Sequence, residues 1–211
     1  MTTPQNLTPV KRNQVRDLLL KKGFEAFRRS SISGAGLKEV LDSASVPKGS
    51  FYYYFESKDA FVHEILQAHA DRHIEHMQAI FSDLSITPVQ RIRKYFETEV
   101  DTCLRNFDTK RVFLAKAGLE LAHTDDVARQ IVEQSFKKLE GGLAGCLSQA
   151  QLQRQISGDI DCEGLATLML NSWQGALLRM KTQQSVAPLQ TFIELFVEEI
   201  LETNVLYGQT A

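Results

Sequence analysis

The sequence predicts an all-α fold of about nine helices, because apolar residues recur at helical spacing in nearly every segment. Alternating apolar and polar runs long enough to build a sheet are absent. Glycine and proline account for only 12 and 5 of the 211 residues, and they fall mostly at the expected breaks between helices. An apolar content of 43% is sufficient for the core of one or two compact domains.

The first four helices are expected to follow one another closely, after a flexible tail over residues 1–10. Pro47 can open the third helix, because proline at the first helical position loses no intrahelical hydrogen bond. The hydroxyl of Ser57 can cap the long fourth helix. The expected ranges are 11–29, 37–44, 47–54 and 57–81.

Five further helices are expected in the rest of the chain. Thr87-Pro88 reads as a cap followed by proline at the first helical position. Gly141-Gly142 falls inside a later helix and could loosen or kink it, and 155–161 reads as a polar loop. The expected ranges are 87–106, 109–122, 124–151, 161–182 and 188–206.

Charge is distributed unevenly along the chain, although the net charge is only −2. Residues 1–58 hold ten Lys and Arg against five Asp and Glu, a charge of +5, whereas residues 59–211 hold 14 against 21, a charge of −7. A basic module ahead of an acidic body favours a nucleic-acid-binding head. We therefore expect such a domain over 11–58 and a second domain over 59–211, joined without a flexible linker.

Several classes of protein are disfavoured. No apolar run approaches the ~18 residues that span a bilayer, and the N-terminus lacks a signal peptide, so we expect a cytoplasmic protein with no membrane partner. Cys103, Cys146 and Cys162 are odd in number and form no CxxC pair. We interpret them as buried hydrophobes, with a reactive sensor thiol as the alternative. Catalytic fingerprints are absent, so neither an enzyme nor a cofactor is expected.

The most informative segment is 33–59, which predicts two short helices around a tight break at 45–47. A small shared apolar core would set the second helix steeply across the first. The exposed face of the second helix would carry a charge, a close-approach glycine, a hydroxyl and two aromatic rings with polar tips: Lys48, Gly49, Ser50, Tyr52 and Tyr53. This is the pattern of a helix-turn-helix whose second helix enters the major groove of double-stranded DNA.

The run VPKGSFYYYF over 46–55, followed by Ser57-Lys58-Asp59, strongly resembles the TetR family of bacterial transcriptional regulators. The resemblance implies a DNA-binding head of three helices and a fourth helix that leads into an all-α ligand-binding and dimerisation body. By matching position, the resemblance implies that the phosphate clamps are Tyr52 and Lys58. It implies that the groove-reading residues are Lys48, Ser50 and Tyr53. It also implies that the entry to the second helix is flanked by Ser33 and Lys38.

The resemblance extends to a subgroup of TetR-type repressors that sense reactive electrophiles or acrylate-like small molecules. It is carried by VPKGSFYYYF and by WQGALLRMK over 173–181, and Glu120 matches an acidic position of the subgroup. That subgroup often has a Gly-Cys-Leu stretch early in its sixth helix, where this chain reads RVFL over 111–114. The usual sensing cysteine is missing, so we expect an inducer that binds without a covalent bond.

The last two helices carry broad apolar faces. In the TetR-like architecture these helices pair with those of a second copy, which implies a homodimer with recognition helices about one DNA turn (~34 Å) apart, matching a pseudo-palindromic operator. The alternative is that both faces belong to the core of a single chain.

An effector cavity, mostly apolar with a few polar anchors, is expected between the fourth and eighth helices. Its candidate residues are His69, His73, Phe96, Cys103, Phe113, Lys116, Glu120, Trp173 and Arg179. Histidines at helical spacing, such as His69 and His73, also suit a metal. No acid or cysteine is clearly placed to complete such a site, so no metal is expected.

The leading interpretation is a ligand-responsive repressor that binds its operator as a homodimer and is released by a small-molecule inducer. The alternative is an architectural DNA-binding protein without an inducer. Sequence preference distinguishes the two, because an architectural protein would bind random duplex about as well as any selected site.

Overall fold

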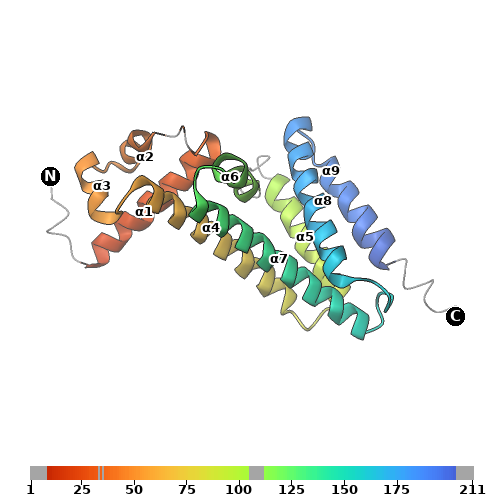
Figure 1. Cartoon of the computed structure of the whole chain (residues 1–211). Coiled ribbons are helices and arrows are strands. Elements are labelled where there is room, and N and C mark those ends of the chain that lie inside the picture. The colour runs from red at the N-terminus through yellow and green to blue at the C-terminus, as the bar shows by residue number, and fades with distance from the viewer. Residues whose placement is uncertain (1–8, 33, 35, 105–111, 203–211) are drawn as a thin grey trace. The chain divides into compact units, whose positions relative to one another are not determined.

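The computed structural model describes residues 9–32, 34, 36–104 and 112–202. Within these residues it contains nine α-helices and no strand, which confirms the predicted all-α class (Figure 1). The last helix continues beyond α9 as η2, with the wider hydrogen-bonding pattern of a π-helix. The elements are α1 (Pro9–Arg29), α2 (Leu37–Ala44), α3 (Lys48–Tyr54), α4 (Lys58–Phe81), α5 (Pro88–Leu104), α6 (Phe113–Leu121), α7 (Asp126–Leu152), α8 (Cys162–Gln183), α9 (Ala187–Phe192) and η2 (Ile193–Glu202).

The helix starts predicted from capping residues are confirmed. The Ser57 hydroxyl accepts the backbone N–H of Ala60 at 2.9 Å. Thr87 and Gln90 cap each other, since the Gln90 N–H donates to Thr87 Oγ1 at 3.3 Å and the Thr87 N–H donates to Gln90 Oε1 at 2.9 Å. Pro47 is the extended residue immediately before α3, so this helix begins one residue later than predicted.

Several predicted features fall on residues that the structure does not describe: residues 1–8 of the tail, Ser33, the end and start of two helices within 105–111, and residues 203–206. Helical structure continues in α7 through Gly141 and Gly142. Gly142 lies against Met77 of α4, and a Cβ at this position would require the flexible end of the Met77 side chain to move.

The chain divides into two compact units by its internal contacts, one within residues 1–70 and 113–132 and the other within 71–112 and 133–211. The first unit contains α1, α2, α3 and α6, and the second contains α5, α8 and α9. Both α4 and α7 contribute residues to each unit, so two continuous helices join the units. The predicted boundary at residue 58, between a DNA-binding domain and a ligand-binding domain, is a different division and remains a prediction.

Aromatic packing holds the first unit together. Phe51 of α3 is fully buried, and its ring meets the edge of Phe61 of α4 with the centroids 5.3 Å apart. Phe55 lies 4.7 Å from the same ring. Gly23 of α1 lies so near Phe61 and Ile65 that a Cβ would collide with both side chains. Helix α3 is therefore fixed against α4, and α4 is fixed against α1.

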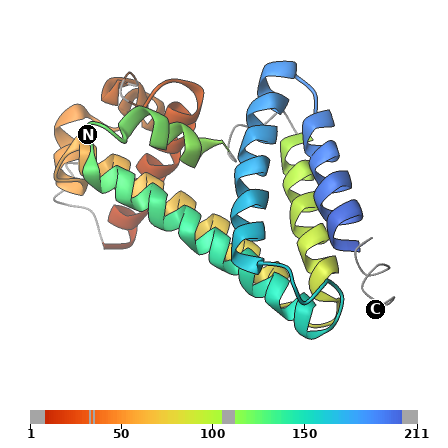
Figure 2. The same ribbon diagram turned by 45° about the vertical axis from the view of Figure 1, so that its right-hand side comes forward.

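The second unit has its own aromatic core between α5, α8 and α9, which lie side by side in Figure 2. Phe96 lies 5.0 Å from Trp173 and 4.7 Å from Phe192, and the latter two rings are 5.1 Å apart. All three side chains are buried. Most of the apolar face predicted for the last helix is buried within the chain, namely Leu189, Phe192, Ile193, Val197 and Leu201.

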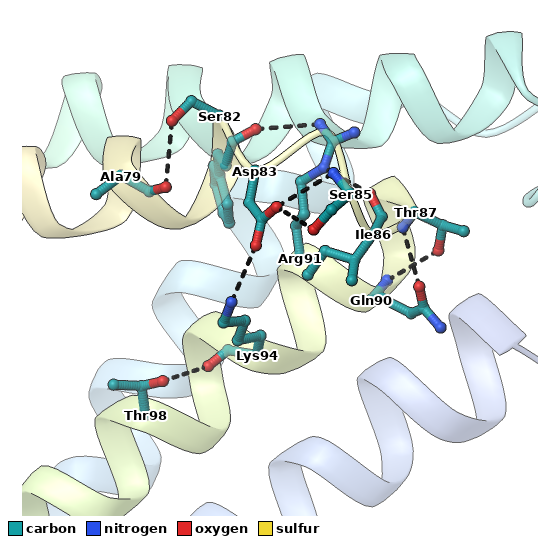
Figure 3. Close-up of polar contacts among 11 residues, drawn as sticks. Ala79, Ser82, Asp83, Ser85, Ile86, Thr87, Gln90, Arg91, Lys94 and Thr98 are labelled. Carbon is teal, nitrogen blue, oxygen red and sulfur yellow. Dashed lines mark hydrogen bonds and ion pairs between the residues drawn. The ribbon is translucent and has the colours of Figure 1, made fainter.

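A buried arginine closes the turn between α4 and α5 (Figure 3). Arg91 is only 2% exposed, and its guanidinium donates to the carbonyls of Phe81 and Ile86, each at 3.1 Å. It also donates to Gln149 Oε1 of α7 at 2.8 Å. Because each acceptor would otherwise lose a hydrogen bond, Arg91 fixes where α4 ends and α5 begins.

Candidate DNA-binding surface and effector region

The turn between α2 and α3 is closed by Ser45, which has the left-handed backbone conformation with φ of 54°. Its N–H donates to the Asp42 carbonyl at 3.1 Å, and the N–H of Val46 donates to the Leu41 carbonyl at 3.0 Å. Pro47 follows with an extended backbone and immediately precedes α3. These local bonds produce the predicted break between the two helices.

The outer face of α3 presents most of the residues predicted to contact DNA. Tyr52 and Tyr53 are 61% and 37% exposed, and Lys48 and Gly49 are also exposed. No atom lies within 4 Å of the position that a Cβ at Gly49 would occupy, so this backbone is open to a ligand. Lys38 on α2 is exposed, and Ser50 and Lys58 are half-buried. Tyr54 packs edge-on against Tyr53.

Two arginines of α1 lie over aromatic rings at the end of α3, and sequence inspection did not single them out. The guanidinium carbon of Arg12 is 4.9 Å from the centroid of Tyr53, and that of Arg16 is 5.2 Å from Phe55. Arg16 also pairs with Glu64 of α4. Their spacing of four residues places both on one face of α1, which was the only available signal in the sequence.

The residues predicted to line an effector cavity are divided between the two units. The first unit holds His69, Phe113, Lys116 and Glu120, and the second holds His73, Phe96, Cys103, Trp173 and Arg179. The structure brings together His69 with Phe113, Lys116 with Glu120, and Phe96 with Trp173. Arg179 is exposed on α8, and Cys103 is fully buried.

His69 of α4 is packed between aromatic rings of two other helices. Its ring stacks on Phe24 of α1 at 5.0 Å and meets Phe113 of α6 edge-on at 5.2 Å. Phe24 and Phe113 are themselves 4.9 Å apart. This cluster joins α1, α4 and α6 within the first unit.

Lys116 and Glu120 of α6 bind the backbone at the end of α1. The Lys116 ammonium donates to the Phe27 carbonyl at 2.8 Å and to the Ser30 carbonyl. The Glu120 carboxylate accepts the N–H of Ile32 at 2.6 Å. Positive charge on the last carbonyls of α1 is the favourable placement for a helix C-terminus. A role for these two side chains in effector binding remains a prediction.

A buried acid lies among histidines in the second unit, and it was not predicted as a site residue. Glu99 of α5 is fully buried, with His73 Nε2 at 3.5 Å and His76 Nε2 at 3.7 Å. The hydroxyl of Tyr95 lies 3.0 Å from His73 Nε2. A carboxylate in such a place needs compensating charge or hydrogen bonds, and the histidines of α4 can supply both.

The three cysteines are buried, as predicted. The Cys146 thiol donates to the Pro88 carbonyl at 3.3 Å. Burial raises the pKa of this thiol to about 11, although the positive charge of Arg91 opposes the shift. At neutral pH the reactive thiolate is therefore scarce at Cys146.

A pocket of about 510 Å³ lies within the first unit, and none of the predicted effector residues lines it. In its wall, His63 Nε2 lies 2.7 Å from Asp125 Oδ2, and Asp125 Oδ1 accepts the N–H of Ala128 at 2.9 Å. Burial acts to raise the pKa of Asp125, but the bonds from Ala128 and His63 outweigh it and lower the pKa. The lining residues are Ile32, Lys58, Asp59, Val62, His63, Leu121, Thr124, Asp125, Asp126 and Val127.

None of the described helices is both long and apolar enough to cross a membrane. No group of three or more His, Cys, Asp or Glu side chains within the described ranges is arranged to hold a metal ion.

Two family models match the chain. The model described as bacterial regulatory proteins, tetR family, matches residues 19–65, and that of the tetracyclin repressor-like C-terminal domain matches residues 88–196. The first match spans the second half of α1, the helix-turn-helix and the start of α4. The second spans α5 to α9 and part of η2.

Similar proteins carry related descriptions. The HTH-type transcriptional repressor DhaR of Mycobacterium sp. (strain GP1) is 32% identical, over 92% of this chain and 96% of its own. The transcriptional regulator AcuR of Cereibacter sphaeroides is 28% identical over 84% of this chain and 81% of its own. Among solved structures, a regulatory protein TetR from Rhodobacter sphaeroides has a TM-score of 0.80 at 27% identity, over 87% and 97% of the two chains. The reduced form of E. coli NemR shares the fold, with a TM-score of 0.82 at 23% identity over 89% and 97%.

The geometry of the α2–α3 motif and these likenesses agree with the resemblance carried by residues 46–59. The chain is a DNA-binding transcriptional regulator and belongs to the TetR family.

Proposed function

We propose that this protein is a cytoplasmic repressor that binds a pseudo-palindromic operator as a homodimer and is released by a small-molecule inducer. The observation that carries the proposal is the outer face of α3, where Lys48, Gly49, Tyr52 and Tyr53 are exposed on a helix fixed by Phe51. The names of DhaR and NemR as repressors support the direction of regulation.

Large apolar side chains left exposed on the last helices support the homodimer. Leu168 and Leu178 of α8 are 53% and 57% exposed, and Leu195 of η2 is 46% exposed. Leu189 and Phe192 of the same C-terminal helix are buried within the chain. Pairing these helices with those of a second copy would remove the exposed leucines from water and give two recognition helices related by a twofold axis.

Buried aromatic rings in the second unit support a non-covalent inducer there, with Phe96 and Trp173 as its apolar contacts and His73 as a polar one. His73 lies beside Tyr95 and Glu99, so a bound molecule with a hydrogen-bonding group would find partners on α4 and α5. The inducer must bind the DNA-free conformation more tightly than the DNA-bound one, since only differential affinity shifts the equilibrium.

The proposed function is tested by selecting duplexes from a random-sequence library with the full-length protein. We expect one reproducible inverted-repeat sequence, bound by two copies of the chain. Lys58→Ala should weaken binding to all duplexes and flatten the salt dependence by about one phosphate contact per protomer. Retention of random duplex without any enriched sequence would support an architectural role and contradict the proposal.

A further inference from the structure

The first turns of α1 lie beside the exposed end of the recognition helix. Arg12 is exposed, and its guanidinium carbon is 4.9 Å from the ring centroid of Tyr53, which is 37% exposed. Tyr53 in turn packs edge-on against Tyr54, with the centroids 5.3 Å apart. The positive charge of Arg12 therefore lies at the surface predicted to face DNA, although it comes from another helix.

Arg12 and Arg16 lie one helical turn apart on the same face of α1, but their partners differ. Arg16 lies over the buried ring of Phe55, and its charge is compensated by Glu64. No ion pair joins Arg12 to a carboxylate within the described part of the chain, and Tyr53 is a neutral partner. The contrast indicates that Arg16 fastens α1 to α4, whereas the charge of Arg12 is available to an external anion.

The guanidinium of Arg12 lies over the Tyr53 ring, and this arrangement suits contact with a phosphate. Arginine commonly stacks one face on an aromatic ring, whereas its N–H donors lie in its plane and remain directed outward. An arginine held by one face can therefore donate to phosphate oxygens in a bidentate manner and loses less side-chain entropy when it does so.

We propose that Arg12 contacts the sugar-phosphate backbone of the operator beside the groove entered by α3, and that the Tyr53 ring is the platform that orients it. The inference rests on the proposed function, since it takes α3 to be the recognition helix. It extends the DNA-binding surface from α2, α3 and the start of α4 to the first turns of α1. In this proposal the ring of Tyr53 positions Arg12, and the hydroxyl of Tyr53 is not needed for that role.

The test measures the affinity of the full-length protein for a duplex selected by the wild type and for random duplex, as a function of salt. Arg12→Gln should weaken both complexes by a similar factor and flatten the log–log salt slope by about 0.9 per protomer. Arg12→Lys should keep the slope because it keeps the charge. The matched control is Arg72→Gln, which removes an exposed arginine of α4 in the other compact unit and should leave the slope unchanged.

A double-mutant comparison on random duplex tests the platform. Tyr53→Phe keeps the ring and should keep the Arg12 effect in full. On a Tyr53→Leu background, Arg12→Gln should cost clearly less affinity than it does in the wild type, because the guanidinium has already lost its support. Full additivity of the two changes would refute the positioning role of Tyr53.

The inference and the proposed function fail in different ways. If the wild type binds no duplex, the proposed function is wrong. If the wild type selects a sequence and Arg12→Gln has the wild-type affinity and salt slope, only the inference is wrong. An equal flattening by Arg72→Gln would also overturn it, because the effect would then reflect total charge. Matching unfolding midpoints exclude misfolding as the cause of any loss.

Discussion

A thiol reacts through its thiolate, so burial decides whether any of the three cysteines can serve as a sensor. All three are buried, and the pKa of Cys146 is raised to about 11. We expect Cys103, Cys146 and Cys162 to react slowly with a thiol reagent in the native protein and rapidly after unfolding. A variant with alanine at all three positions should still bind its operator and still release it with inducer.

Alanine is the appropriate replacement, because a buried serine hydroxyl could destabilise the fold for an unrelated reason. The measurement is operator release by inducer in the variant and the wild type. If the variant folds and binds DNA but no longer responds, a cysteine is the sensor and the non-covalent mechanism is wrong.

Ser45 pays a conformational cost that glycine would not. Its φ of 54° lies in the left-handed region, which disfavours residues with a Cβ. We expect Ser45→Gly to raise the free energy of unfolding by about 0.5–1 kcal/mol. Ser43→Gly, inside α2, should lower it by a similar amount because glycine weakens a helix interior. Thermal or denaturant unfolding measures both, and a loss of stability in Ser45→Gly would contradict the argument.

Among the elements, the α4–α5 turn should show the clearest pH dependence. The Ser85 hydroxyl, the Lys94 ammonium and the Ser85 N–H lower the pKa of Asp83 from 3.8 to about 2 (Figure 3). The charged form is thus favoured by folding, so its stabilisation is present above pH 3.8 and is lost as the pH falls through about 2. Asp83→Asn should be less stable than the wild type at neutral pH, and the difference should close in this acid range. A difference that persists at the lowest pH would exclude this linkage.

The attachment of α6 to the end of α1 can be tested separately. Glu120→Ala removes the acceptor of the Ile32 N–H, and we expect a loss of about 1–2 kcal/mol with faster hydrogen exchange at that amide. Glu120→Gln retains an acceptor and should lose less. Glu133→Ala, which removes an exposed partner of Lys137, serves as the control and should change stability little. Unchanged protection of Ile32 in Glu120→Ala would rule out the bond.

The elements themselves could be predicted largely because their signals are local. Ser57 and Thr87 cap groups three residues away, so the sequence alone reveals them. Lys116 and Glu120 were expected at an effector site, yet they bind backbone groups some ninety positions earlier in the chain. Contacts of that range depend on how helices pack, and a single sequence carries no periodic signal for them. The contact of Arg12 could not be predicted for the same reason, since Tyr53 is brought to it only by folding.

At the scale of the whole molecule, the exposed leucines predict the oligomeric state. Leu178→Asp or Leu195→Asp should give monomers in sedimentation and abolish operator binding, because one head reads half a site. Leu84→Asp is the control, since Leu84 is 82% exposed on the α4–α5 turn and should tolerate charge. A dimer that survives both α8 and η2 substitutions would place the interface elsewhere.

The first compact unit is drawn from two stretches that are separated along the chain by part of the second. Phe113, Lys116 and Glu120 reach α1 and its C-terminal end from the later stretch. A single crossover after α3, the simplest way to recombine two such regulators, would therefore separate α1 from the helix that packs against it. A hybrid regulator built by exchanging DNA-binding heads should therefore receive residues 113–132 together with residues 1–70. Otherwise the contacts that Phe24, Phe27 and Ile32 make with residues 113–132 must be replaced.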